Sequence, residues 1–219
     1  MAIELTERDR AVLDHIRRYR ITVSRTLQEQ FCDRSENAAK KLVARLRDYV
    51  ASETLVGNSV YYRLTPLGAR LLGAPEEIAQ PLGVQALPRA FGVLAFCCNG
   101  QTQRWRYTRP EFGEDFPELA EEMLKNDYYL DFYMDSDGMT VRLGHILVDL
   151  GGSCEQILKK CRGRIRRYQR TIPAELFAIA IVVPSDEKRQ GIKDALKQRP
   201  LRAWLRIEVV PELGQLIAN

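Results

Sequence analysis

The stretch of this chain best suited to do chemistry is a basic segment near its start, residues 35–50, SENAAKKLVARLRDYV. Lysines and arginines surround Leu42, Val43 and Leu46, so a helix formed by this segment would have one apolar side and one cationic side. A cationic side attracts polyanions such as DNA, but many basic helix sides are only solvated. The segment alone leaves both interpretations open.

The distribution of charge favours a polyanionic partner for the N-terminal part. Residues 1–72 contain 13 Lys and Arg against 9 Asp and Glu, and the other 147 residues contain 20 of each. The formal net charge of +4 therefore comes entirely from the first third of the chain. An excess of this sign in one region indicates a surface that meets acidic groups.

Three helices are expected to position the basic segment. The first covers residues 7–19, with Thr6 as its N-cap and apolar residues recurring at helical spacing. The β-branched residues 21–23 interrupt it, and Ser24 is expected to cap a second helix. Ser35 then caps the third helix, which carries the basic side chains.

A β-hairpin follows the third helix. Residues 53–56 and 59–64 resemble strands, and Gly57-Asn58 between them suits a tight turn. Thr65-Pro66 then begins a further helix, since proline is favoured at the first helical position. The order helix, short strand, helix, turn, helix, hairpin is that of a winged helix-turn-helix.

This region resembles the winged-helix proteins that read the major groove with their third helix, and YYRLTPLGARLL is similar to the wing and following helix of many of them. The resemblance implies a DNA-binding domain over residues 1–72, in which Asn37 pairs with adenine and Lys40 and Lys41 meet guanine or phosphate. Glu36 is discordant, because a carboxylate repels phosphate unless it accepts from cytosine. The implied interface comprises Arg25, Ser35, Glu36, Asn37, Lys40, Lys41, Arg45, Arg47, Asn58, Ser59 and Arg63.

A linker and a second domain are expected after the wing. Residues 73–83, GAPEEIAQPLG, have two prolines, two glycines and no periodicity, which indicates a linker. The second domain then covers residues 84–219. Its first segment, 84–98, is apolar nearly all round and predicts a helix that is enclosed in a core or lies at a dimer interface.

The rest of the second domain predicts a mixed sheet covered by helices on both faces. After a short strand at 104–108, the acidic segment 109–124 is expected to be helical toward its end. Continuous apolar runs indicate strands buried on both faces. The further expected elements are strands at 127–135, 139–143 and 145–150, a helix capped by Ser153, a strand at 177–184, a helix begun by Ser185, and a last strand in LRIEVVP.

The predicted order of α, three strands, α, β, α, β resembles the PD-(D/E)xK nuclease-like core, and its tandem with a winged helix resembles the replication-relaxation family of plasmid and mobile-element proteins. Active nucleases of that kind hold a divalent cation that activates water. The resemblance places Asp137 and Asp149 at the metal, with Lys160 as a displaced lysine, because Gly151 stands where the lysine is expected. Turn and strand-end roles for the two aspartates are the alternative.

A second basic segment lies in the helix that follows Ser153. Residues 154–171 contain a single acid, Glu155, so the cations form a strong local field. This ridge contacts nucleic acid, pairs with the acidic residues 111–122, or serves solubility. Its residues are Lys159, Lys160, Arg162, Arg164, Arg166, Arg167 and Arg170.

The sequence therefore predicts a sequence-specific binder of double-stranded DNA, either a transcriptional regulator or a mobile-element accessory protein. A homodimer is among the expected assemblies. A Mg²⁺-dependent endonuclease and a protein-interaction module are the alternatives. We expect no cofactor outside the nuclease alternative, and reduced cysteines with neither zinc nor disulfides. With no apolar run long enough to span a membrane, we expect no membrane partner and a cytoplasmic protein.

Overall fold

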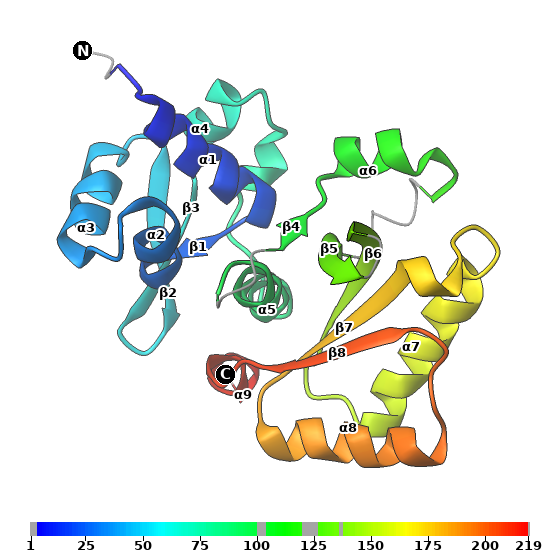
Figure 1. The fold of residues 1–219 in the computed structure, drawn as a ribbon. Coiled ribbons are helices and arrows are strands. Elements are labelled where there is room, and N and C mark those ends of the chain that lie inside the picture. The colour runs from blue at the N-terminus through cyan, green and yellow to red at the C-terminus, as the bar shows by residue number, and fades with distance from the viewer. Residues whose placement is uncertain (1–3, 100–103, 120–126, 136–137, 219) are drawn as a thin grey trace. The chain divides into compact units, whose positions relative to one another are not determined.

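A computed structural model describes residues 4–99, 104–119, 127–135 and 138–218, with side chains except those of 133–140. The structure is a mixture of helices and strands with two separate sheets (Figure 1). It divides into two compact units, the first formed by residues 1–94 and 98–101 and the second by residues 95–97 and 102–219. No helix within these described ranges is both long and apolar enough to cross a membrane.

The first unit has the predicted order of elements. They are α1 (Glu7–Tyr19), β1 (Thr22–Val23), α2 (Ser24–Phe31), α3 (Glu36–Arg45), β2 (Val50–Val56), β3 (Ser59–Leu64), α4 (Pro66–Leu71) and the 3-10 helix η1 (Glu76–Ala79). The three strands form one antiparallel sheet in the order β1-β3-β2.

Side-chain caps fix the starts of three of these helices. The Thr6 hydroxyl accepts a hydrogen bond from the Asp9 N–H at 3.2 Å, and the Asp9 carboxylate accepts from the Thr6 N–H at 2.9 Å. Ser35 caps α3 and Thr65 caps α4, each through its hydroxyl oxygen. These caps confirm the helix starts that the sequence predicts, because each side chain satisfies an N–H that the first helical turn leaves open.

The predicted cap by Ser24 was wrong. Val23 occupies the N-cap position of α2 without a side-chain hydrogen bond, and Ser24 is the first helical residue. The Ser24 hydroxyl lies 3.2 Å from the Tyr62 hydroxyl of β3, so it bonds to the sheet instead of the helix end.

The hairpin turns at Gly57, whose φ of 54° lies in the left-handed region that glycine adopts at little cost. β2 begins at Val50, three residues earlier than predicted, because Val50 already pairs with Leu64. The hairpin is therefore longer at its base than the sequence suggests.

The core of the first unit forms between the apolar sides of its helices and the base of the β2–β3 hairpin. Ala39, Leu42 and Leu46 of the third-helix segment are buried as predicted, whereas Val43 is only partly buried. The buried residues are Val12, Leu13, Ile16, Leu27, Cys32, Ala39, Leu42, Leu46, Val50 and Leu64.

The segment expected to be a linker has structure of its own. It contains η1, Ala79 is buried, and Ile78 packs against the core of the first unit. The division between the two units falls later, within the predicted apolar helix α5 (Ala86–Cys98). Residues 91–98 of α5 are buried.

The second unit contains a five-stranded mixed sheet in the order β4-β5-β6-β7-β8. β4, β5 and β6 pair antiparallel, and β6, β7 and β8 pair parallel. Its elements are β4 (Trp105–Arg106), α6 (Arg109–Asp115), β5 (Asp127–Asp135), β6 (Gly138–Val148), α7 (Cys154–Tyr168), the 3-10 helix η3 (Ala174–Leu176), β7 (Phe177–Val183), α8 (Asp186–Gln198), β8 (Trp204–Val209) and α9 (Glu212–Ala218).

The two strands predicted at 139–143 and 145–150 are one continuous strand, β6, so the three-strand prediction for 127–150 was wrong. Gly144 is not a turn residue. It lies within the ladder opposite Tyr129, and a Cβ added at Gly144 would lie 1.9 Å from Tyr129 Cε1. The glycine makes room for the Tyr129 ring, which is fully buried.

Helices α7 and α8 lie against one face of this sheet (Figure 1). Ser153 and Ser185 cap them as predicted. β7 is buried at every residue, which confirms the expectation for a continuous apolar strand. Helix α6 occupies the start of the acidic segment, the end of that segment lies outside the described residues, and the sequence did not suggest α9.

Candidate nucleic-acid interface

The turn between α2 and α3 sets the direction of the basic helix. Asp33 and Arg34 both have positive φ, 46° and 63°. Two hydrogen bonds hold this turn: the Arg34 N–H donates to the Gln28 carbonyl at 2.8 Å, and the Ser35 N–H donates to the Cys32 carbonyl at 2.7 Å. Because left-handed backbone is unfavourable for residues with a Cβ, packing of both helices must maintain this turn.

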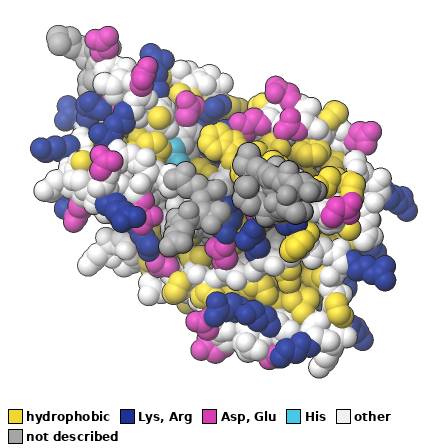
Figure 2. All heavy atoms as spheres, in the orientation of Figure 1, with side chains coloured by type: hydrophobic (Ala, Val, Ile, Leu, Met, Phe, Trp, Pro, Cys, Tyr) yellow, Lys and Arg dark blue, Asp and Glu magenta, His cyan; other side chains and the backbone are white. Residues whose placement is uncertain are grey.

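The side of α3 opposite the core is exposed and carries several of the predicted contact residues, and Arg47 follows in the turn after the helix. Asn37, Lys40, Lys41 and Arg47 are all exposed. In Figure 2, Lys and Arg side chains lie over the part of the surface where Figure 1 places α3. The helix therefore presents donors and positive charge to solvent.

Glu36 pairs with Lys40 one helical turn away. The carboxylate and the ammonium lie 2.6 Å apart, with 65% and 70% of the two side chains exposed. Their hydrogen bond and mutual attraction lower the pKa of Glu36 and raise the pKa of Lys40. The discordant carboxylate thus neutralises one of the two adjacent lysines in the free protein.

Arg45 has a structural partner that the sequence did not suggest. Its guanidinium donates to the fully buried carboxylate of Asp9 on α1. Burial would raise the pKa of Asp9, but hydrogen bonds from Thr6 and Arg45 outweigh it and lower that pKa. The pair joins the end of α3 to the start of α1, which leaves less of Arg45 for a ligand.

The β2–β3 hairpin presents polar groups at its tip and a fixed cation at its base. Asn58 and Ser59 are exposed at the turn. Arg63 donates to Glu53 at 2.6 Å and to the Ala79 carbonyl at 2.5 Å, and its side chain is 14% exposed. Arg63 therefore links the β2–β3 hairpin to η1. Its bond to Ala79 spans 16 residues of sequence, so the alternation of residues along a strand could not predict it.

Two further groups lie beside the basic helix. Arg25 of α2 is exposed and pairs with Glu29 at 2.9 Å. The Tyr62 phenol on β3 adds to the effect of Glu36 in raising the pKa of Lys40, so Tyr62 lies near the helix. Tyr62 was not among the residues predicted from the sequence, although an aromatic residue on a strand near a basic helix is a signal that could have found it.

The basic ridge lies on the exposed side of α7. Ile157, Leu158, Cys161, Ile165 and Tyr168 are buried as predicted. Lys159, Lys160, Arg166, Arg167 and Arg170 are exposed, and Arg162 and Arg164 are half-buried. Arg162 donates to the Arg199 carbonyl at 3.4 Å.

The aspartate of the nuclease alternative is held in a loop. Asp149 follows β6, and its Oδ1 accepts from the N–H groups of Gly151 and Gly152 at 3.0 and 2.9 Å. The ammonium near its Oδ2, at 3.4 Å, belongs to Lys188 of α8 and not to Lys160. Asp149 thus closes the turn into α7. Glycines that follow an aspartate at the end of a strand are a sequence signal for this role.

Asp137, the other candidate carboxylate, lies outside the described residues. Among the residues that are described, no group of three or more His, Cys, Asp and Glu is placed to hold a metal ion. Comparison of the chain with protein-family models, with curated proteins and with solved structures finds no match.

Proposed function

We propose that this chain binds double-stranded DNA through the exposed side of α3, with the hairpin β2–β3 acting as a wing. The observation that carries the proposal is the solvent-facing set of Asn37, Lys40 and Lys41 on α3, whose other side is core, with the exposed Arg47 in the turn just after the helix. An amide and ammonium groups on one helix side suit base edges and phosphates. Asn58 and Ser59 at the wing tip add donors for phosphate.

We further propose that the second unit is a PD-(D/E)xK nuclease-like scaffold that serves docking or dimerisation rather than cleavage. Three consecutive antiparallel strands, β4, β5 and β6, are followed by α7 and the parallel strand β7, which supports that likeness. The engagement of Asp149 by its own loop and by Lys188 disfavours a metal-bound role for it. A transcriptional regulator or a mobile-element accessory protein of the replication-relaxation type fits both proposals.

Replacement of Lys40 and Lys41 by alanine tests the interface. Genomic fragments that the chain retains provide the target duplex, and fluorescence anisotropy measures its affinity. We expect a loss of about 1 to 3 kcal/mol for each base contact removed, and less where only phosphate is met.

Lys193→Ala with Lys197→Ala is the matched control. Both lysines are exposed on helix α8, and Lys197 pairs with Asp194 much as Lys40 pairs with Glu36. The control removes the same charge from the second unit and should weaken binding far less. Equal losses of DNA affinity for the two double variants would contradict a DNA contact by α3. They would show that the effect comes only from the change in net charge.

Cleavage is tested in the same samples. We expect the duplex to stay intact in Mg²⁺ or Mn²⁺ and the affinity to persist in EDTA. Nicking that depends on the metal would favour the endonuclease alternative.

A further inference from the structure

The strand β8 forms one edge of the sheet in the second unit. Within the part of the chain that the structure describes, β8 pairs only with β7. The Val210 N–H, just after the strand, donates to the Val183 carbonyl of β7 at 2.9 Å. Since successive residues of a strand direct their N–H and C=O groups to opposite sides, residues 204, 206 and 208 bond to β7. The N–H and C=O groups of Leu205, Ile207 and Val209 therefore point outward.

No group among the described residues hydrogen-bonds to these outward N–H and C=O groups. Leu205, Ile207 and Val209 are each partly exposed. The strand has no proline and no lysine, which are residues that commonly protect a sheet edge from pairing. Such an edge accepts another strand through main-chain hydrogen bonds.

The side chains of β8 indicate which strand fits. A two-fold axis pairs a strand with its own copy in antiparallel orientation, and outward groups must meet outward groups. Centring the pair on Arg206 or on Glu208 would place identical charges opposite each other, which is unfavourable. Centring it on Ile207 places Arg206 opposite Glu208 twice and Leu205 opposite Val209 twice.

We propose that two copies of this chain associate by antiparallel pairing of β8 with β8, centred on Ile207. Arg206 and Glu208 remain available for the cross-strand pair although each has a partner in its own chain. Arg206 bonds to Asp131 and Glu208 to Arg104, yet about a third of each side chain, 37% and 34%, is exposed. The pairing needs no DNA and does not rest on the proposed function.

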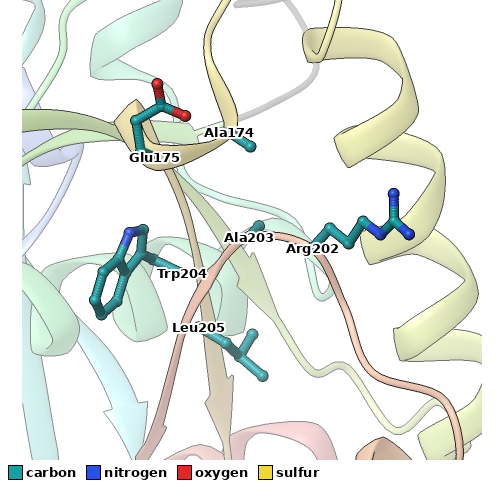
Figure 3. Close-up of a pocket in the computed structure, with 6 residues that line it drawn as sticks. All are labelled: Ala174, Glu175, Arg202, Ala203, Trp204 and Leu205. Atoms are coloured by element: carbon teal, nitrogen blue, oxygen red, sulfur yellow. The ribbon is translucent and has the colours of Figure 1, made fainter.

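A shallow pocket of about 390 Å³ lies at the beginning of the strand (Figure 3). The side chains of Trp204 and Leu205, two of the residues that line the pocket, point in different directions (Figure 3). The guanidinium carbon of Arg142 lies 3.8 Å from the centre of the Trp204 ring. In the Ile207-centred register, Ala203 lies opposite Pro211 of the second copy, which brings the start of that copy's α9 beside this pocket. The exposed indole, 54% exposed, then gains a cover.

The test is amide hydrogen exchange of the full chain without DNA, detected by NMR at a series of increasing protein concentrations. Sedimentation velocity on the same samples measures the oligomeric state. A six-residue edge buries little surface, so we expect a weak dimer that forms as concentration rises. The exchange rates of the amides of Leu205, Ile207 and Val209 should then fall, by a factor of up to about ten. The amides of Arg206 and Glu208, bonded to β7, should stay protected throughout and act as the internal control.

Ile207→Pro removes the central outward donor without removing a bond to β7, a position where edge strands tolerate proline. We expect this variant to remain monomeric with an unchanged circular dichroism spectrum. If it fails to fold, the exchange of the wild-type amides decides alone. The proposal is overturned by a chain that is monomeric at every concentration, or by a dimer in which the three outward amides exchange freely.

Discussion

His15 shows how a single side chain joins three elements of the first unit. Its Nε2 lies 3.1 Å from the Thr22 hydroxyl, and its ring lies 4.8 Å from the Tyr19 ring and 5.3 Å from the Phe31 ring. Burial lowers the pKa of His15 from 6.5 to about 4, and Arg18 adds to the effect. The imidazole is therefore neutral at pH 7 and behaves as a core residue.

This pKa predicts acid sensitivity of the first unit. Unfolded His15 binds a proton near pH 6.5 and folded His15 only near pH 4, so stability is complete above 6.5 and declines as pH falls between these values. The free energy of unfolding should fall by up to about 1.4 kcal/mol per pH unit in this window. Urea unfolding, followed through NMR amide signals of residues 4–94, measures it. In His15→Gln the slope should largely vanish, and an unchanged slope would contradict the assignment.

Two glycines predict opposite effects of one substitution. Gly144→Ala would push a methyl group into the Tyr129 ring and should destabilise the second unit by about 1 to 3 kcal/mol. Gly163, on the exposed side of α7, has nothing within 4 Å of an added Cβ, so Gly163→Ala should stabilise by about 0.5 to 1 kcal/mol. Both tryptophans, Trp105 and Trp204, lie in the second unit, so tryptophan fluorescence during urea unfolding reports its stability. Equal effects would mean that the Tyr129 ring does not fill this space.

At the scale of the element, α3 combines a carboxylate with the lysines proposed to meet DNA. Because Glu36 neutralises Lys40 and would lie near phosphate, Glu36→Gln should strengthen binding and make it more dependent on salt. Fluorescence anisotropy at several salt concentrations checks both effects. A loss of affinity that is confined to targets with one particular cytosine would instead show that Glu36 accepts from its amino group.

Elements whose boundaries depend on local chemistry were predictable from the sequence. Thr6, Ser35 and Ser153 cap helices where expected, because the hydroxyl and the N–H it serves are three residues apart or fewer. Contacts between distant residues were not predictable. The hydroxyl of Ser24 bonds to that of Tyr62, which lies 38 residues away in the sequence. Gly144 suggests a break between two strands, because the sequence does not show that the Tyr129 ring packs against it.

The same limit applies to the candidate site. The exposed position of Lys40 and Lys41 follows from the helical period around Leu42, so the sequence could predict it. The pairing of Arg45 with Asp9, 36 residues away, could not be predicted, because a charge pattern does not show which surface cation lies above a buried acid. Lys188 beside Asp149 is a case of the same kind.

At the scale of the whole molecule, exposed cations occur in both units although residues 1–72 account for the net positive charge. Residues 73–219 contain equal numbers of acids and bases, yet α7 concentrates its cations on one side. Lys159 and Lys160 are exposed and form no ion pair with the described part of the acidic segment. Two acids of that segment accept hydrogen bonds from residues just before α6. Asp115 accepts from the Tyr107 hydroxyl, and Glu111 accepts from the Thr108 N–H.

Salt dependence tests whether the ridge contacts nucleic acid. Each phosphate neutralised on B-DNA contributes about 0.9 to the slope of log affinity against log salt. Lys159→Ala with Lys160→Ala should therefore lower the slope by up to about 1.8 if both lysines meet phosphates, and the loss should add to that of Lys40→Ala with Lys41→Ala. Anisotropy titrations of the two double variants and their combination measure this. An unchanged slope and an unchanged affinity for the ridge variant would exclude these two lysines from the nucleic-acid interface.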